Sequence, residues 1–292
     1  RMLALLILII LLACIGTTAI SMPKKVVITG AGGQTGQALF RKALACPDEF
    51  DPLGLVRTPE SKAALVETGI PESKVAVVDV CDADAVKKVA KGCDAFCIAT
   101  SAKPKPTGES NPETERPVFG FPNGSPEEVD WLGQKNQIDA CSPDTHVVVC
   151  SSMGGTDPSN PLNALGRTTN PDGTTSGGNI LMWKRKAEKY LIDSGRPYTI
   201  VHPGGLLNEP GGERELVVGV DDEQIGTDSR TVPREDVAEV MLQSIRHPKI
   251  YCNRSFDLRA KPPGDGKPTT DFTTLLDSLD GRNCDYKLGE TM

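Results

Sequence analysis

The sequence has little of several features that mark large classes of protein. Its longest apolar run, residues 2–15, is shorter than the ~20 residues that span a bilayer. Basic residues are in deficit, because 32 Lys and Arg against 39 Asp and Glu give a net charge of −7. With aromatic residues at 4%, this acidic balance argues against a nucleic-acid partner, which needs basic patches or stacking platforms.

Cysteine and histidine are sparse too. Nine cysteines in 292 residues are too dilute for a disulfide scaffold. The cysteines and the three histidines form no cluster with the spacing of metal ligands, so we expect no metal site. The apolar content of 38% nevertheless exceeds that of disordered chains and is sufficient for a substantial core.

The first 21 residues have the pattern of a signal or targeting segment. Arg1 precedes the apolar run and small residues follow it, as in a signal peptide with its cleavage zone. The alternative is a chain that starts at Met22, which is followed by Pro and two Lys. A real leader would direct the protein to the secretory pathway or a plastid, whereas a start at Met22 would leave it in the cytoplasm. Asn123 and Asn253 begin N-glycosylation triplets, which matter on the secretory route.

Beyond the leader, β-branched runs alternate with segments of helical periodicity. We expect strands at residues 25–29, 52–57, 74–80, 94–100, 146–150 and 198–202, and helices at 37–46, 59–67, 83–91, 127–141 and 179–194. This alternation predicts an α/β protein with a doubly wound, mostly parallel Rossmann sheet and helices on both faces. Residues 22–292 would form a single NAD(P)-binding domain, with a Pro- and Gly-rich loop at 101–126 and a small, irregular C-terminal portion after Gly204 that contacts the substrate.

A glycine-rich loop joins the first strand to the first helix. Gly30, Gly33 and Gly36 have the spacing of dinucleotide-binding proteins. In that pattern the first glycine permits a tight turn, the second lets the backbone approach a pyrophosphate, and the third lets the helix pack on the strand. The pyrophosphate lies at the N-terminus of the helix, where free amide groups favour an anion. We therefore expect the dinucleotide to contact Gly30, Gly32, Gly33, Gln34, Thr35 and Gly36.

The end of the second strand indicates which dinucleotide is bound. NAD-binding proteins place an Asp or Glu there to hold the ribose 2′-hydroxyl, whereas this sequence has Arg57. A guanidinium suits a 2′-phosphate, so NADP(H) is favoured over NAD(H); a solvated surface arginine is the alternative. Because ligands bind at the carboxyl ends of parallel strands, we also expect cofactor contacts after the third and fourth strands. These residues are Asp79, Val80, Thr100 and Ser101.

Five segments together indicate a family resemblance: residues 29–36, 130–140, 151–155, 178–188 and 203–206. In combination they resemble the atypical short-chain dehydrogenase/reductase family, in its NmrA-like NAD(P)-binding branch. Within it, the sequence is similar to a group of plant and algal Rossmann proteins of unassigned substrate. The resemblance runs from about residue 24 to residue 279. It implies a single Rossmann domain, bound NADP and an oxidoreductase activity.

One departure from that family concerns catalysis. Most short-chain dehydrogenases use a Tyr four residues before a Lys on the long helix to pass the proton. Here Ile180 precedes Lys184 by four positions and Met182 precedes Lys186 by four, and neither side chain can donate a proton. Tyr190 lies six residues beyond Lys184 and is expected to face elsewhere. The usual proton relay is therefore absent.

Other residues remain as catalytic candidates. Ser152 follows the fifth strand and can orient a substrate carbonyl, and Lys184 retains a role in ribose binding. His202, at the end of the sixth strand, is a candidate acid. Pro203 and Gly204 form a turn suited to backing the nicotinamide. The alternative for Ser152 is a loop or helix-capping serine, and the alternative for His202 is a structural histidine.

Three functions are compatible with these features. The first is an NADPH-dependent reductase of an unknown small molecule, in which the proton comes from Ser152, His202, water or the substrate. The second is a non-catalytic NADP(H)-binding redox sensor that changes its affinity for a regulatory protein partner, which the missing Tyr favours. The third, association with RNA, is disfavoured by the acidic balance and the few aromatic residues. No stable membrane span is expected in the mature chain.

Overall fold

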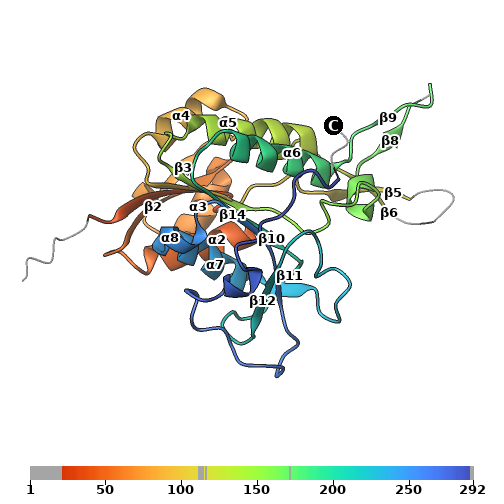
Figure 1. Cartoon of the computed structure of the whole chain (residues 1–292). Coiled ribbons are helices and arrows are strands. Elements are labelled where there is room, and N and C mark those ends of the chain that lie inside the picture. Colours follow the sequence, from red (N-terminus) through yellow and green to blue (C-terminus); the bar gives the residue numbers. More distant parts are fainter. Residues whose placement is uncertain (1–21, 111–114, 116, 171, 290–292) are drawn as a thin grey trace, which may run out of the picture.

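An eight-stranded sheet runs through the protein. The computed structural model, drawn in Figure 1, describes residues 22–110, 115, 117–170 and 172–289. The predicted leader, residues 1–21, lies outside the described residues. All neighbouring strands are parallel except β12, which runs antiparallel to β14. The strands, from one edge to the other, are β12 (Leu216–Gly219), β14 (Arg254–Ala260), β10 (Tyr198–Pro203), β7 (His146–Cys150), β4 (Ala95–Ile98), β1 (Lys24–Thr29), β2 (Phe50–Val56) and β3 (Val75–Val77).

The inner strands are apolar on both faces. Residues 26–29 of β1 are buried in succession, and so are all four residues of β4. Near-continuous runs of this kind are typical of parallel sheets that helices cover on both sides. The order β3-β2-β1-β4-β7-β10 is that of a doubly wound Rossmann sheet, with the switch point between β1 and β4. The predicted fold class is confirmed.

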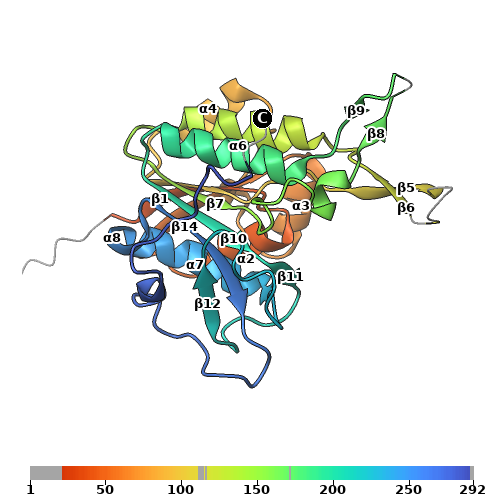
Figure 2. The same cartoon turned by 45° about the vertical axis from the view of Figure 1, so that its right-hand side comes forward.

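Two layers of helices cover the sheet, one on each face (Figures 1 and 2). One layer contains α2 (Gln34–Leu44), α3 (Pro59–Glu67), α7 (Arg234–Arg246) and α8 (Pro248–Tyr251), and the other contains α4 (Ala83–Ala90), α5 (Gln134–Ala140) and α6 (Ile180–Asp193). Single 3₁₀ turns occur at η1 (Glu72–Lys74), η3 (Pro161–Ala164) and η4 (Asp277–Leu279). Among the described residues, no helix is both long enough and apolar enough to cross a bilayer.

Each layer packs on its own apolar cluster. The cluster beneath α2 and α7 includes Phe40, Tyr251 and Phe256, all fully buried. The cluster beneath α4, α5 and α6 includes Phe96 and Ile138. These two clusters hold the strand ends in place, and the strand ends in turn position the candidate site.

Two hairpins extend beyond the carboxyl ends of the parallel strands (Figures 1 and 2). One pairs β5 (Lys105–Ser110) with β6 (Pro117–Gly120), and the other pairs β8 (Thr168–Thr169) with β9 (Thr175–Ser176). The first hairpin corrects the prediction of an irregular loop at 101–126. All six residues of β5 are exposed, so the strand has no buried face and its sequence has no apolar alternation.

Two more predictions are corrected. The expected helix at 127–141 begins as a π-helix, η2 (Glu127–Gly133), and continues as α5. The chain after Gly204 is more regular than predicted, because it supplies α7, β12 and β14 and a small sheet of β11 (Gly205–Leu207) and β13 (Thr231–Pro233). The sequence pattern of a buried strand is weak in β14, because the buried polar residues Ser255 and Asp257 alternate with Phe256 and Leu258 and interrupt the apolar run.

Candidate functional site

The glycine loop lies between the carboxyl end of β1 and the start of α2. Gly30 has a φ of +70°, in the left-handed region that favours glycine. A Cβ on Gly30 would lie 2.4 Å from the carbonyl oxygen of Ala99, which follows β4. A Cβ on Gly36 would lie 2.3 Å from the carbonyl oxygen of Gly30, so α2 packs directly on the end of β1. Backbone contacts within the protein therefore require both glycines.

The N-terminus of α2 is suited to an anion. Gly33 precedes the helix and offers no side chain to cap it, and the first turn has no acidic residue. Gly32, Gly33 and Gln34 are exposed. Because the first amide groups of a helix lack intrahelical partners and lie at the positive end of the helix dipole, this exposed end fits the pyrophosphate of a dinucleotide.

Arg57 lies next to this loop. A Cβ on Gly32 would be 3.4 Å from a side-chain carbon of Val56, the last residue of β2, so the glycine loop adjoins the start of the Arg57 segment. The exposed guanidinium donates from Nη1 to the backbone carbonyl oxygen of Asn123, at 2.6 Å. A guanidinium has five N–H donors, so this contact leaves others for a phosphate.

Two amide side chains of α5 hold the loops that follow β3 and β4. Asn136 donates to the carbonyl oxygen of Val80, at 3.2 Å. Gln137 donates to Oγ1 of Thr100, at 3.4 Å. Asp79 and Ser101, the other predicted cofactor contacts there, are exposed. The resemblance included this segment of the sequence, but its role in fixing two loops at the sheet edge was not predicted.

A buried ion pair lies behind the same edge. Lys184 of α6 places Nζ 2.7 Å from Oδ1 of Asp130, and the two side chains are 8% and 0% exposed. The second carboxylate oxygen of Asp130 accepts a hydrogen bond from the amide of Ala102, at 3.0 Å. The predicted ribose-binding lysine is therefore paired with a carboxylate that the sequence did not identify. This pair links α6 and η2 to the loop after β4.

The remaining catalytic candidates lie at the ends of β7 and β10. Ser152 is half-buried, and its hydroxyl donates to the carbonyl oxygen of Met153 at 3.0 Å. Ile180 and Met182, in the positions that Tyr would occupy, are both buried in α6. Pro203 ends β10, and a Cβ on Gly204 would lie 1.8 Å from the carbonyl oxygen of Arg230, so this glycine is required by close backbone packing.

His202 does not lie at an open edge. Its side chain is 5% exposed, and Nε2 lies 3.0 Å from Oε2 of Glu188 on α6. Glu188 also accepts a hydrogen bond from the buried hydroxyl of Ser151. Burial alone would lower the pKa of His202, but the adjacent Glu188 carboxylate and Cys284 raise it well above its usual value. Burial opposes ionisation of Glu188, yet the charge of His202 and these hydrogen bonds lower its pKa to about 2.

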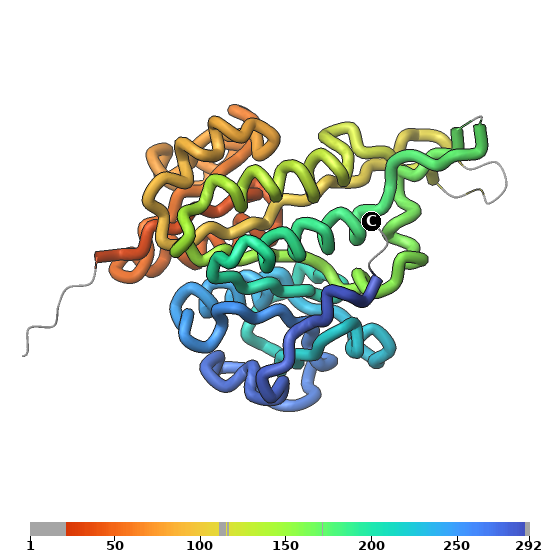
Figure 3. Tube along the Cα trace, turned by 45° about the horizontal axis from the view of Figure 1, so that its top comes forward, coloured from red at the N-terminus to blue at the C-terminus, as the bar shows by residue number. Residues whose placement is uncertain are grey.

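The C-terminal tail, residues 281–289, covers this histidine. Figure 3 shows the tail running along α6 toward the hairpins. Arg185 holds it there, because Nε donates to the carbonyl oxygen of Leu288 at 2.8 Å and Nη2 donates to that of Asp285. The Arg185 guanidinium also lies over the Tyr286 ring, 4.6 Å from its centroid. We therefore assign His202 no direct contact with a substrate, in contrast to its prediction as an acid.

Known proteins resemble this chain over most of its length. It is 43% identical over 266 residues to an uncharacterized chloroplastic protein of Arabidopsis thaliana, a match that covers 90% of this chain and 77% of that protein. It is 39% identical over 275 residues to sanguinarine reductase of Eschscholzia californica, covering 87% of this chain and 95% of the reductase. A solved structure from Bacillus halodurans, described as an NAD-dependent epimerase/dehydratase, has a TM-score of 0.63 at 22% identity and covers 88% of this chain and 100% of that one.

These matches confirm the predicted resemblance to NAD(P)-binding Rossmann proteins with plant relatives. The solved structure supports the fold alone, and the NmrA-like branch stays a prediction. The family model for NAD(P)H-binding proteins matches residues 30–248. This chain belongs to that NAD(P)H-binding family.

Proposed function

We propose that this protein binds NADPH at the carboxyl edge of its sheet and reduces a small organic molecule there. The observation that carries the proposal is the exposed, uncapped N-terminus of α2 beside the Arg57 guanidinium. The amide groups of the α2 N-terminus, from Gly32 to Gly36, would hold the pyrophosphate, and Arg57 would hold the 2′-phosphate. The adenine would contact the Asp79–Val80 loop. Thr100, Ser101, Pro203 and Gly204 would line the rest of the crevice.

Bound NADPH would supply a hydride. The chain's own part is to orient the substrate and hold the crevice rigid, because Ile180 and Met182 cannot donate a proton. Ser152 is the hydroxyl available to orient a carbonyl at the end of β7. The buried pair of Lys184 and Asp130 fixes the loop that carries Ser101. Carbonyl or quinone-like substrates that take their proton from water suit this arrangement.

Nucleotide titration tests the cofactor. NADPH should bind the purified protein more tightly than NADH, and Arg57→Ala should weaken NADPH by roughly 10- to 100-fold with little effect on NADH, since hydrogen bonds to charged groups contribute about 1.5–3 kcal/mol. Arg41→Ala is the matched control, because Arg41 is an arginine of α2 that binds Thr68. Absence of binding, or a preference for NADH, would overturn the proposal.

Substrate turnover needs a separate assay. The 39% identity to sanguinarine reductase makes sanguinarine the first compound to supply, followed by a panel of quinones and aldehydes. We expect substrate-dependent loss of NADPH absorbance, and a reduced product in equal amount. A Ser152→Ala variant should turn over more slowly while binding NADPH with unchanged affinity.

The alternative function is a redox sensor without turnover, which the missing Tyr at Ile180 and Met182 favours. It requires tight NADP(H) binding, no NADPH consumption with any compound, and a protein partner that is recovered with NADPH or with NADP but not with both. If no compound of the substrate panel causes NADPH consumption and such a partner is recovered, the protein is a sensor and not a reductase.

We also propose a plastid location. The support is the chloroplastic protein of Arabidopsis thaliana, which shares 43% identity with this chain. A fluorescent fusion of the complete chain should be found in plastids. Its appearance in the secretory pathway or the cytoplasm would contradict the proposal.

A further inference from the structure

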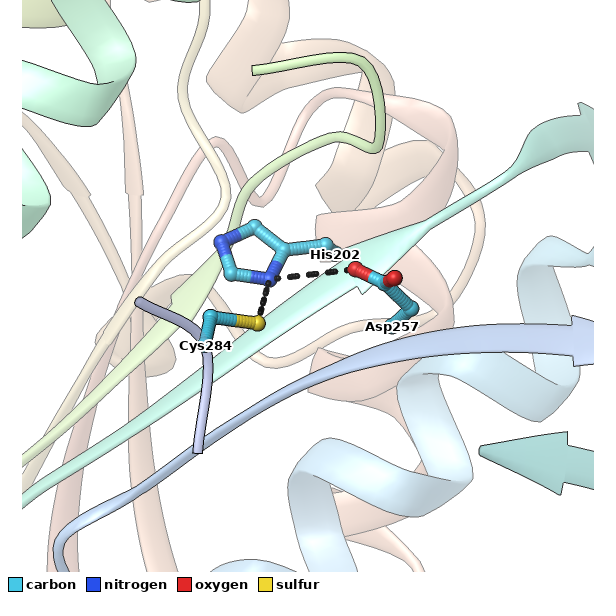
Figure 4. A group of neighbouring side chains, drawn as sticks. All are labelled: His202, Asp257 and Cys284. Atoms are coloured by element: carbon cyan, nitrogen blue, oxygen red, sulfur yellow. Dashed lines mark hydrogen bonds and ion pairs between the residues drawn. The ribbon is translucent and has the colours of Figure 1, made fainter. Parts of the chain in front are cut away.

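Three side chains from distant segments converge beneath the C-terminal tail. His202 ends β10, Asp257 lies on β14 and Cys284 belongs to the tail, and Figure 4 shows them pointing toward one another. Counted as whole residues, His202, Asp257 and Cys284 are 4%, 1% and 8% exposed. Among the described residues, they form the one group of His, Cys and carboxylate side chains that could hold a metal ion.

The two distances from the His202 nitrogen to the other donor atoms suit one tetrahedral ion. Nδ1 of His202 is 3.6 Å from Sγ of Cys284 and 3.7 Å from Oδ1 of Asp257. All three ligand atoms lie within 4.8 Å of one another. Metal bonds of about 2.0–2.3 Å at tetrahedral angles place neighbouring ligand atoms about 3.4–3.6 Å apart. The imidazole nitrogen and its two partners thus already have nearly the separation that a Zn²⁺ ion requires.

The opposite side of the His202 ring has the partner expected of a metal ligand. Nε2 lies 3.0 Å from the Glu188 carboxylate, which holds the proton of that nitrogen, so Nδ1 is the nitrogen that a metal would contact after losing its own proton. Metal-binding histidines almost always donate their second N–H to such an acceptor, which fixes the tautomer and the ring orientation. Glu188 is itself held by the hydroxyl of Ser151.

The other two ligands are also fixed from outside the cluster. Oδ2 of Asp257 accepts a hydrogen bond from the amide of Asp222 at 2.8 Å, so Oδ1 is the oxygen that faces His202. The amide of Cys284 donates to the carbonyl oxygen of Ser255 at 3.2 Å, which anchors the tail on β14. The charge of Arg185 acts on Glu188, whereas Asp257 and Cys284 face the imidazole, so a divalent cation between them would add positive charge where these two ligands meet.

We propose that His202, Asp257 and Cys284 bind Zn²⁺, which fastens the C-terminal tail to β10 and β14. Nitrogen, oxygen and sulfur ligands together match the preference of Zn²⁺, and three protein ligands leave the fourth position for a water. Binding releases the thiol proton of Cys284 and any proton on Nδ1 of His202. The site lies next to Pro203 but takes no part in holding NADPH, so it stands whether or not the proposed reductase does.

Metal analysis and cobalt spectroscopy test the site. Purified protein, with any affinity tag removed, should retain about one Zn²⁺ per chain after dialysis, and the metal-free protein should bind Co²⁺ with a thiolate-to-cobalt charge-transfer band. Cys284→Ser should lose the band, whereas Cys252→Ser, which removes a half-buried thiol elsewhere, should keep it. At 100 times its Kd, Zn²⁺ should raise the Tm by roughly 4–5 °C in the wild type and the Cys252 variant.

A further variant tests the supporting carboxylate. Glu188→Gln should leave one site per chain and lower the affinity for Co²⁺ about 10- to 100-fold. Wild-type protein that shows no thiolate–cobalt band overturns the proposal without reference to any variant. A band that persists in Cys284→Ser overturns it equally, because the thiol would then belong to another site.

Discussion

Lys184 and Glu188, two of the buried charged residues of helix α6, are one turn apart and lie in very different surroundings. Lys184 meets one carboxylate, that of Asp130, at 2.7 Å. Glu188 meets His202, which is also close to Asp257, Cys284 and Tyr286. Burial raises the pKa of Asp257 to about 6 although the charge of His202 opposes this, and the nearby Asp222 carboxylate adds a smaller upward effect.

The difference between the surroundings of Lys184 and Glu188 shows two roles that buried charged side chains have in this protein. The pair at Lys184 is balanced one against one, and it connects two helices to a loop of the proposed cofactor crevice. The group at His202 combines one imidazole with two carboxylates and a thiol, the charge of Arg185 acts on one of these carboxylates, Glu188, and the tail covers the group. The balanced pair positions neighbouring segments, whereas the second group brings together nitrogen, oxygen and sulfur atoms of the kinds that Zn²⁺ binds.

Removing one member of the balanced pair should have the largest effect. Lys184→Met leaves Asp130 buried without its partner, so we expect the free energy of unfolding to fall by about 3–5 kcal/mol, measured by urea denaturation. Adding Asp130→Asn should recover at least part of that loss. Lys186→Met is the matched control, because Lys186 lies 4.9 Å from the centroid of the Trp131 ring, and its loss should cost less than about 1 kcal/mol. Equal losses in the two single variants would contradict a structural role for the pair.

The effect of acid on a second buried histidine should be smaller. His146 lies 2.8 Å from the Thr199 hydroxyl, which itself donates to the carbonyl oxygen of Tyr251. Burial, with a smaller effect of Lys24, lowers the pKa of His146 to about 4. A lowered histidine pKa favours the folded state above the unfolded-state pKa near 6.5, and this stability is lost as the pH falls toward 4.

We therefore expect His146 to contribute a loss of about 2 kcal/mol in unfolding free energy between pH 7.5 and pH 5. Denaturation at the two pH values, in wild type and in His146→Gln, measures this as the difference between their pH dependences. An identical pH dependence would show that His146 takes up its proton equally in both states. It would also remove the contrast with His202, whose pKa is raised by an adjacent carboxylate.

The smallest effect is expected on the outer side of α6. Tyr190 donates its hydroxyl to Asp139 at an exposed site, at 2.6 Å, and packs edge-on against Trp131. Tyr190→Phe should lower the free energy of unfolding by about 0.5–1 kcal/mol. NADPH turnover should stay unchanged, because this tyrosine is hydrogen-bonded on the surface and takes no part in a proton relay. Loss of turnover in this variant would show that the relay persists in a new position.

Local patterns in the sequence were sufficient for six of the eight strands of the sheet, for the helices before residue 195 and for the glycine loop, but not for α7, β12 and β14. A short β-branched run at residues 25–29 predicted β1, and the spacing of Gly30, Gly33 and Gly36 predicted the turn into α2. The lack of Tyr before Lys184 was equally plain, because it concerns one position on one helix. The roles of the individual cofactor contacts, from Gly32 to Gly204, remain proposals.

Contacts between residues that are far apart in the sequence could not be predicted from the sequence. Asp130 and Lys184 meet because a π-helix and α6 lie together at the same edge of the sheet. His202, Asp257 and Cys284 meet because the tail folds back over two strands, and nothing in the spacing of the three residues indicates this. Periodicity and turn chemistry act over a few residues, so the sequence alone determined the fold class and the glycine loop. The tertiary structure decided which charged side chains are buried together, because packing of the layers brings separate segments within a few ångströms. It therefore also decided which buried groups could bind an ion.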